Sequence, residues 1–139
     1  MIYKRCSRCG KRIQSGSKCG CQKERHREYD HFSRDKKAKD FYGSGEWEKA
    51  REEALEADGG IDVYLYMTRG EIVVADMVHH ITPLRDDWNR RVDVDNLMSL
   101  SSATHSLIEN LYKQNKQKTM EELYKMLERF RQQVRAGGI

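Results

Sequence analysis

Three histidines in the second half of the chain have the types and spacing of a catalytic metal site. His79 and His80 are adjacent, and His105 is followed by Glu109 at the distance of one helical turn. Imidazole and carboxylate groups bind divalent metal ions, and a histidine kept off the metal can serve as a base near neutral pH. Asn96 lies between them and offers an amide that can bind the metal or tie a loop. The five residues predict metal-dependent hydrolysis.

Phosphodiester hydrolysis matches these groups. The reaction needs a nucleophilic water, charge stabilisation on the phosphate and assistance for the leaving 3′ oxygen. We expect His80 to deprotonate the water and Asn96 to assist as a catalytic residue. His79 and His105 are the expected metal ligands, and Glu109 is either a third ligand or a partner of one.

Short elements must position these side chains. Residues 78–81 are apolar around the histidines and predict a strand, in which His79 and His80 point to opposite faces. Residues 96–100 predict a second strand. Ser101 or Ser102 is the expected cap of a helix that carries the His105–Glu109 pair on one face.

Flanking segments complete the expected α+β fold. Ser44 is a predicted N-cap of a helix that runs to about Ala57, and the β-branched residues and tyrosines of 61–81 predict strands with a turn at Arg69-Gly70. A capping box predicts that Thr119 opens the last helix. We expect the apolar stripe of this helix to pack against the domain, with a coiled-coil dimer seam as the less simple alternative. The stripe consists of Met120, Leu123, Leu127, Phe130 and Val134.

All four cysteines lie near the N-terminus, in two close pairs with glycines between them. Four thiolates in such pairs predict a structural zinc knuckle rather than a catalytic metal, because the ion would have no open position. Reduced, unligated thiols are the alternative. The expected ligands are Cys6, Cys9, Cys19 and Cys21.

Charge is distributed unevenly along the chain. Residues 1–40 carry a net charge of +8, whereas residues 41–139 carry −4. The first part is therefore expected to be a basic arm that binds a polyanion, most simply nucleic acid, although a solvated charged tail has the same composition. The candidate phosphate contacts are Arg25, Arg27, Arg34, Lys36 and Lys37.

The sequence has no apolar stretch of membrane-spanning length and no recognisable signal peptide. We therefore expect a cytoplasmic protein without a membrane partner, in the bacterial host cytoplasm if a phage encodes it.

The ordered set of His80, Asn96 and His105 resembles the HNH endonuclease family. The phrases 78–84 and 95–100 are similar to the two strands of its ββα-metal (His-Me finger) motif, and residues 41–44 with Trp47 are similar to phage and prophage members. The resemblance covers roughly residues 41–112. It implies an HNH domain over 41–139, with a core at about 72–113, flanking helices and a C-terminal helix, joined to the zinc-knuckle arm at 1–40.

The resemblance also implies roles for the motif. His80 would be the general base, His79 and His105 would bind one catalytic ion (Mg, Mn, Ni or Zn), and Asn96 would be a ligand or an orienting residue. Glu109 stands where colicin-type DNases have a further ligand. Phage members of this branch are associated with genome packaging beside the terminase, which implies that partner here.

One feature departs from the family pattern. Many members clamp the motif with a zinc held by two Cys-x-x-Cys pairs, and the corresponding segments here are 61–64 and 101–104, without cysteine. Because all four ligands are missing together, we expect packing by Ile61 and Tyr64 to replace this zinc.

The sequence thus predicts an endonuclease that nicks or cuts double-stranded DNA, as a monomer or weak homodimer. The alternatives are a non-catalytic zinc-knuckle protein that binds nucleic acid and a restriction or homing nuclease on the same scaffold.

Overall fold

The computed structural model describes residues 3–5, 12–15 and 36–137. Its internal contacts divide the chain into two units, Met1–Asp40 and Phe41–Ile139. The expected zinc ligands Cys6, Cys9, Cys19 and Cys21, and the arginines Arg25, Arg27 and Arg34, lie outside the described residues.

The described part of the N-terminal unit contains a small hairpin. Strands β1 (Tyr3–Arg5) and β2 (Arg12–Gln14) are antiparallel, and the guanidinium of Arg12 lies 4.2 Å from the centroid of the Tyr3 ring. Residues 36–42 are helical, with Lys36 and Lys37 exposed.

A second antiparallel hairpin is the centre of the larger unit. Strand β3 (Met77–His80) pairs with β4 (Leu97–Leu100), so that His79 faces Met98 and His80 faces Leu97. Helix α4 (Ser102–Arg135) follows β4 directly, and Ser101 caps it by accepting a hydrogen bond from the Thr104 amide. The α+β class and the strand–strand–helix order expected from the sequence are confirmed.

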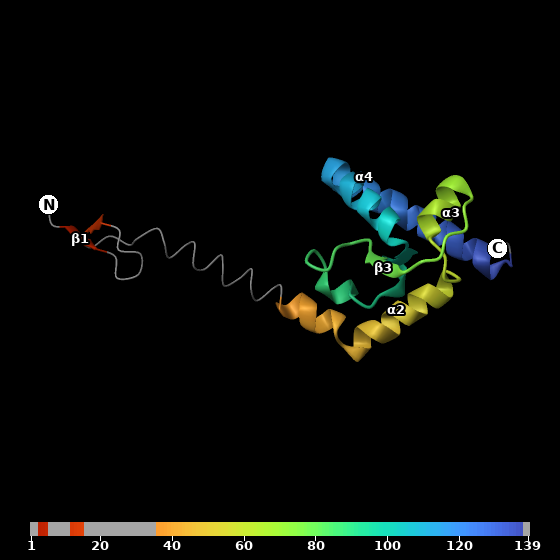
Figure 1. Cartoon of the computed structure of the whole chain (residues 1–139), viewed down its shortest axis with the longest axis horizontal. Helices are drawn as coiled ribbons and strands as arrows, with labels where there is room; N and C mark the ends of the chain where they lie inside the picture. The colour runs from red at the N-terminus through yellow and green to blue at the C-terminus, as the bar shows by residue number, and fades with distance from the viewer. Residues whose placement is uncertain (1–2, 6–11, 16–35, 138–139) are drawn as a thin grey trace. The chain divides into compact units, whose positions relative to one another are not determined.

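Helices cover both faces of this hairpin (Figure 1). One face packs on helix α2 (Gly45–Ala57), which starts at the predicted cap Ser44 and buries Trp47, Ala50 and Ala54. The other face packs against helices α3 (Val63–Arg69) and α4. That larger core consists of Val63, Ile81, Met98, Leu100, Ile108, Leu123, Leu127 and Phe130.

Residues 63–69 form a helix, so the strands and hairpin turn predicted for this segment are wrong. Asp62 caps α3 (Val63–Arg69), its Oδ1 accepting from the Leu65 amide at 2.9 Å, and Gly70 ends it with a φ of 68°. The only β pairing found in the described residues around α3 is the isolated bridge between Ile61 and Val74. The end signals and the burial of Val63 outweigh the β propensity of the tyrosines.

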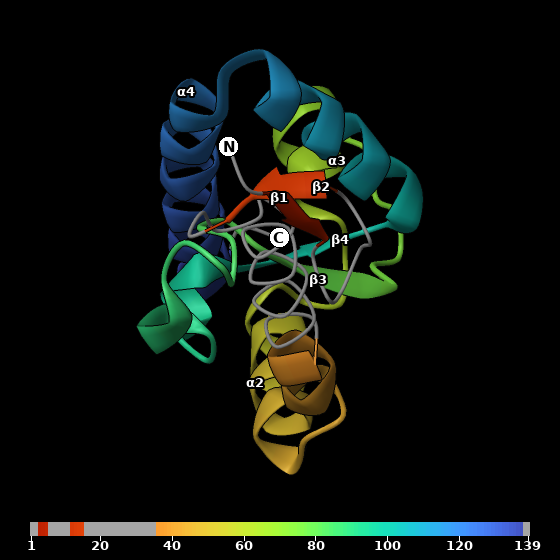
Figure 2. The same ribbon diagram turned by 90° about the vertical axis from the view of Figure 1, so that its left-hand side faces the viewer.

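Helix α4 is sharply bent at Asn115, where φ is −158° and ψ is 93° (Figure 2). Asn115 Oδ1 accepts a hydrogen bond from the Lys118 amide at 3.1 Å and thereby caps the second half. The predicted start at Thr119 is wrong by one turn, because asparagine is at least as good a cap as threonine. The predicted apolar stripe does pack against the domain, through Leu123, Leu127 and Phe130.

A buried ion pair joins the second half of α4 to the end of α2. Arg131 Nε lies 2.9 Å from Asp58 Oδ1, and both side chains are almost fully buried. Nη1 and Nη2 of Arg131 donate to the carbonyls of Val94 and Leu97, each at 2.7 Å, and Nη2 also donates to Asp58 Oδ2 at 3.3 Å. Asp58 accepts from the Ser99 amide as well. The second half of α4, which follows the bend at Asn115, is therefore fixed to the end of α2 and to the backbone of β4.

Within the described ranges, no helix is both long and apolar enough to span a membrane.

Candidate active site

The last two residues of β3 carry the paired histidines to opposite faces of the hairpin. His79 is 5% exposed and its ring centroid lies 5.1 Å from that of His105 on α4. His80 is 6% exposed and stacks on Trp47 of α2 at 5.0 Å. The strand alternation expected from the sequence thus separates the two imidazoles.

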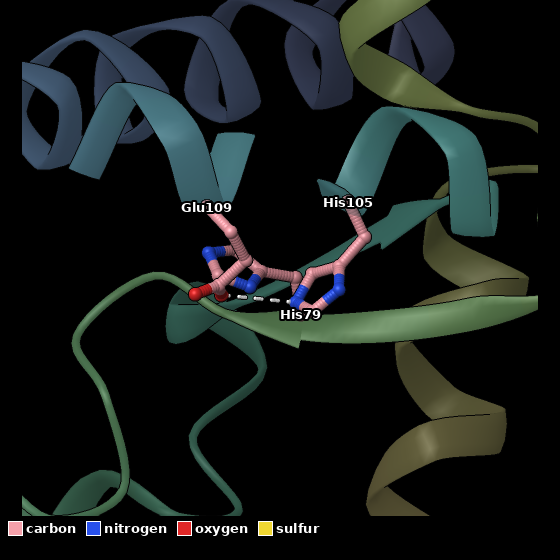
Figure 3. A group of neighbouring side chains, drawn as sticks. All are labelled: His79, His105 and Glu109. Carbon is pink, nitrogen blue, oxygen red and sulfur yellow. Dashed lines mark ion pairs between the residues drawn. The ribbon is translucent and has the colours of Figure 1, made fainter. Parts of the chain in front are cut away.

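On the α4 face, His79, His105 and Glu109 converge (Figure 3). One potential ligand atom from each lies within 4.8 Å of the others. His105 Nε2 and Glu109 Oε1 are 3.2 Å apart, because the first turns of α4 place residues i and i+4 on one face.

This group fits a divalent transition metal. Ligands at about 2.0–2.2 Å from an ion are themselves roughly 3 Å apart, close to the observed His105–Glu109 separation. Two imidazoles and one carboxylate form a mixed N/O donor set, and three protein ligands leave positions open for water and substrate.

His79 is held by the tyrosine that follows two helical turns after His105. His79 Nε2 lies 3.0 Å from the Tyr112 hydroxyl, which donates to the Ile81 carbonyl at 2.5 Å. Burial, together with the charges of His105 and His80, lowers the pKa of His79 to about 3. The ring is therefore neutral at physiological pH, as metal binding requires.

His80 has a different set of partners. Its Nε2 donates to the Arg91 carbonyl at 2.9 Å, and its Nδ1 lies 3.4 Å from the Tyr42 hydroxyl. Burial lowers the pKa of His80, and the hydrogen bond to Arg91 opposes this shift. With Nε2 holding the ring proton, Nδ1 has the lone pair that a base needs, and this lone pair accepts from the Tyr42 hydroxyl.

Asn96 is fully buried and its amide is saturated. Its oxygen accepts from the Thr82 amide at 2.7 Å and from the Tyr124 hydroxyl, while its nitrogen donates to the carbonyls of Thr82 at 3.1 Å and Arg90 at 3.4 Å. Two lone pairs and two protons account for all four bonds. The structure thus places Asn96 at the end of the loop between β3 and β4, in a short 3-10 turn directly before β4, outside the group formed by His79, His105 and Glu109.

Residues that sequence reasoning missed complete the site. Tyr112 follows His105 and Glu109 at i+7 and i+3, so its place on their helical face was a readable signal. Tyr124 comes from the second half of α4, and its hydroxyl also contacts Thr82 at 2.5 Å and Arg90 at 2.7 Å. Nothing in the sequence pairs Tyr124 with Asn96, since the contact depends on the bend.

Comparison with known proteins agrees with this geometry. No family model and no curated protein matches the chain. Among solved structures, the chain is similar to the crystal structure, containing manganese, of the HNH endonuclease of the deep-sea thermophilic bacteriophage GVE2. The two share 39% sequence identity at a TM-score of 0.58, over 63% of this chain and 94% of that one.

The strand–strand–helix element with its His and Glu group defines the ββα-metal class. At this level of identity and coverage, the chain belongs to the HNH endonuclease family.

Proposed function

We propose that this chain is a metal-dependent DNA endonuclease that hydrolyses phosphodiester bonds. The observation that carries the proposal is that two adjacent histidines lie in different environments. His79 joins His105 and Glu109 in a group with metal-ligand spacing, while His80 lies outside it with one nitrogen fixed by a carbonyl. The similarity to a manganese-containing HNH endonuclease supports the same reading.

The metal site would be formed by His79, His105 and Glu109. A divalent ion bound there supplies Lewis-acid stabilisation of the phosphate charge and of the leaving oxygen. Imidazole ligands favour manganese, nickel or zinc over magnesium, which prefers oxygen ligands.

His80 would act as the general base. The Arg91 carbonyl fixes the proton on Nε2, so Nδ1 accepts the proton of the attacking water. Because burial lowers the pKa of His80, the ring is unprotonated near neutral pH. The Tyr42 hydroxyl, 3.4 Å from Nδ1, offers a hydrogen-bond partner to a water bound there.

Asn96 would be a positioning residue rather than a metal ligand. Its nitrogen holds the Arg90 carbonyl, one residue before the carbonyl that fixes His80. Its oxygen has no lone pair left for an ion. Asn96 would thus keep the loop in the conformation that selects the His80 tautomer.

The substrate would be double-stranded DNA, with the basic arm and its cysteine knuckle contacting phosphates. Lys36 and Lys37, exposed at the end of the arm, are the described candidates for these contacts. The bacteriophage source of the similar structure supports a phage or prophage origin. A role beside the terminase in DNA packaging belongs to the same proposal and rests on family resemblance.

A plasmid assay tests the proposal. Supercoiled DNA is incubated with the full chain and Mn²⁺, Ni²⁺, Zn²⁺ or Mg²⁺, with EDTA as the control. The proposal expects nicked or linear product with at least one ion and none with EDTA. Plasmid that stays intact under every metal, while the protein retards DNA on a gel, would instead indicate a non-catalytic binding protein.

A further inference from the structure

The Tyr112 hydroxyl lies between two groups at the end of β3. It is 3.0 Å from His79 Nε2 and 2.5 Å from the Ile81 carbonyl oxygen. The Tyr112 ring also meets the His79 ring nearly edge to face, with centroids 5.4 Å apart and planes at 75°. The contact therefore restrains both the position and the orientation of the His79 imidazole.

Counting protons decides the direction of each hydrogen bond. A carbonyl oxygen can only accept, so the single phenolic proton of Tyr112 is donated to Ile81. The hydroxyl then has only lone pairs to offer His79, and Nε2 must carry the ring proton. The lone pair of the neutral imidazole is consequently on Nδ1, the nitrogen left for the group with His105 and Glu109.

We propose that Tyr112 is a positioning residue that selects the metal-binding tautomer of His79. If the proton were on Nδ1, that atom could not bind an ion, and Nε2 would face the Tyr112 hydroxyl instead. The inference rests on the proposed function, because it assigns an orienting partner to one ligand of that site. Partners of this kind hold a ligand ring in place and favour one tautomer.

The placement of Tyr112 on α4 explains how the arrangement is maintained. His105, Glu109 and Tyr112 are at i, i+4 and i+7 of one helix, so a single rigid element carries two ligands and the group that orients the third. The Ile81 carbonyl belongs to the residue just after β3, which fixes the helix to the strand that carries His79. Ligand spacing and tautomer choice are thus set together.

Two measurements on the full chain test the inference. The first is long-range ¹H–¹⁵N NMR of the metal-free protein with labelled histidine, which distinguishes the two neutral tautomers of His79. The second is calorimetric titration with Mn²⁺ of the unmodified protein, Tyr112→Phe and Tyr66→Phe. Tyr66 is a matched control, because it also packs against the core and makes its ring contact with Phe130.

We expect the Nε2–H tautomer in the unmodified protein and a mixture of tautomers in Tyr112→Phe. Mn²⁺ affinity should fall about 10- to 100-fold in Tyr112→Phe and remain unchanged in Tyr66→Phe. A His79 proton on Nδ1 in the unmodified protein would overturn the inference, even if Tyr112→Phe fails to fold. Equal affinity of Tyr112→Phe and the unmodified protein would also overturn it.

These readouts are separate from cleavage. If the tautomer and affinity results are as expected but plasmid remains intact, the nuclease proposal fails and the role of Tyr112 in metal binding stands. If plasmid is cleaved but the affinity does not depend on Tyr112, the nuclease proposal stands and the proposed role of Tyr112 fails.

Discussion

Asn96→Ala removes four hydrogen bonds from the loop that holds the proposed base. The partners left behind are the amide and carbonyl of Thr82, the Arg90 carbonyl and the Tyr124 hydroxyl. At about 1 kcal/mol for each bond, and with water replacing some of them, the variant should lose about 3 kcal/mol of unfolding free energy. For a domain of this size, that corresponds to a fall in Tm of roughly 12–24 °C.

Thermal unfolding by circular dichroism checks this magnitude, with Asn89→Ala as the control, since Asn89 is exposed in the same loop. Below its lowered Tm, Asn96→Ala should bind Mn²⁺ as the unmodified protein does and cleave DNA much more slowly. If it loses Mn²⁺ affinity as severely as His105→Ala does, Asn96 is a ligand and the positioning role is refuted. An unchanged Tm would refute the hydrogen-bond argument.

Two further perturbations test the framework of the site. Arg131→Ala leaves the carboxylate of Asp58 buried without its partner, so urea titration should show a loss of about 3–5 kcal/mol, whereas the exposed Arg129→Ala should show almost none. Stability of the metal-free protein should also fall as the pH drops from 6.5 towards 3, by about 1.4 kcal/mol per pH unit, since the unfolded chain binds a proton that buried His79 does not. His79→Gln should reduce this slope, and identical slopes would contradict the assigned burial effect.

Local patterns made the centre of the site predictable. A period of two separates His79 from His80, and a spacing of four brings His105 to Glu109, so neither result depends on distant parts of the chain. The start of α2 at Ser44 was readable for the same reason, since a cap acts on the next three residues.

Contacts between distant segments could not be predicted from the sequence. The Asp58–Arg131 pair and the Tyr124–Asn96 hydrogen bond both depend on where the bend at Asn115 directs the second half of α4. The start of the second half of α4 was misplaced from Asn115 to Thr119, because both residues can cap a helix and they stand four positions apart.

Segments 61–64 and 101–104, which contain no cysteine pair, are held in place by polar as well as apolar contacts. Ile61 and Tyr64 pack against the core, as the sequence suggested. In addition, Asp62 Oδ2 accepts hydrogen bonds from both the amide and the hydroxyl of Ser101, each at 2.9 Å. One carboxylate thus caps α3 and joins it to the start of α4, a link that composition alone does not indicate.

Parallel Mn²⁺ titration and plasmid cleavage with His80→Ala and His105→Ala test the division of labour most directly. The account predicts that His80→Ala binds Mn²⁺ with nearly unchanged affinity and cleaves about 10²- to 10⁴-fold more slowly, as expected when a general base is removed. It predicts that His105→Ala loses both Mn²⁺ affinity and cleavage. Equal loss of Mn²⁺ affinity in the two variants, or full cleavage by His80→Ala, would contradict it.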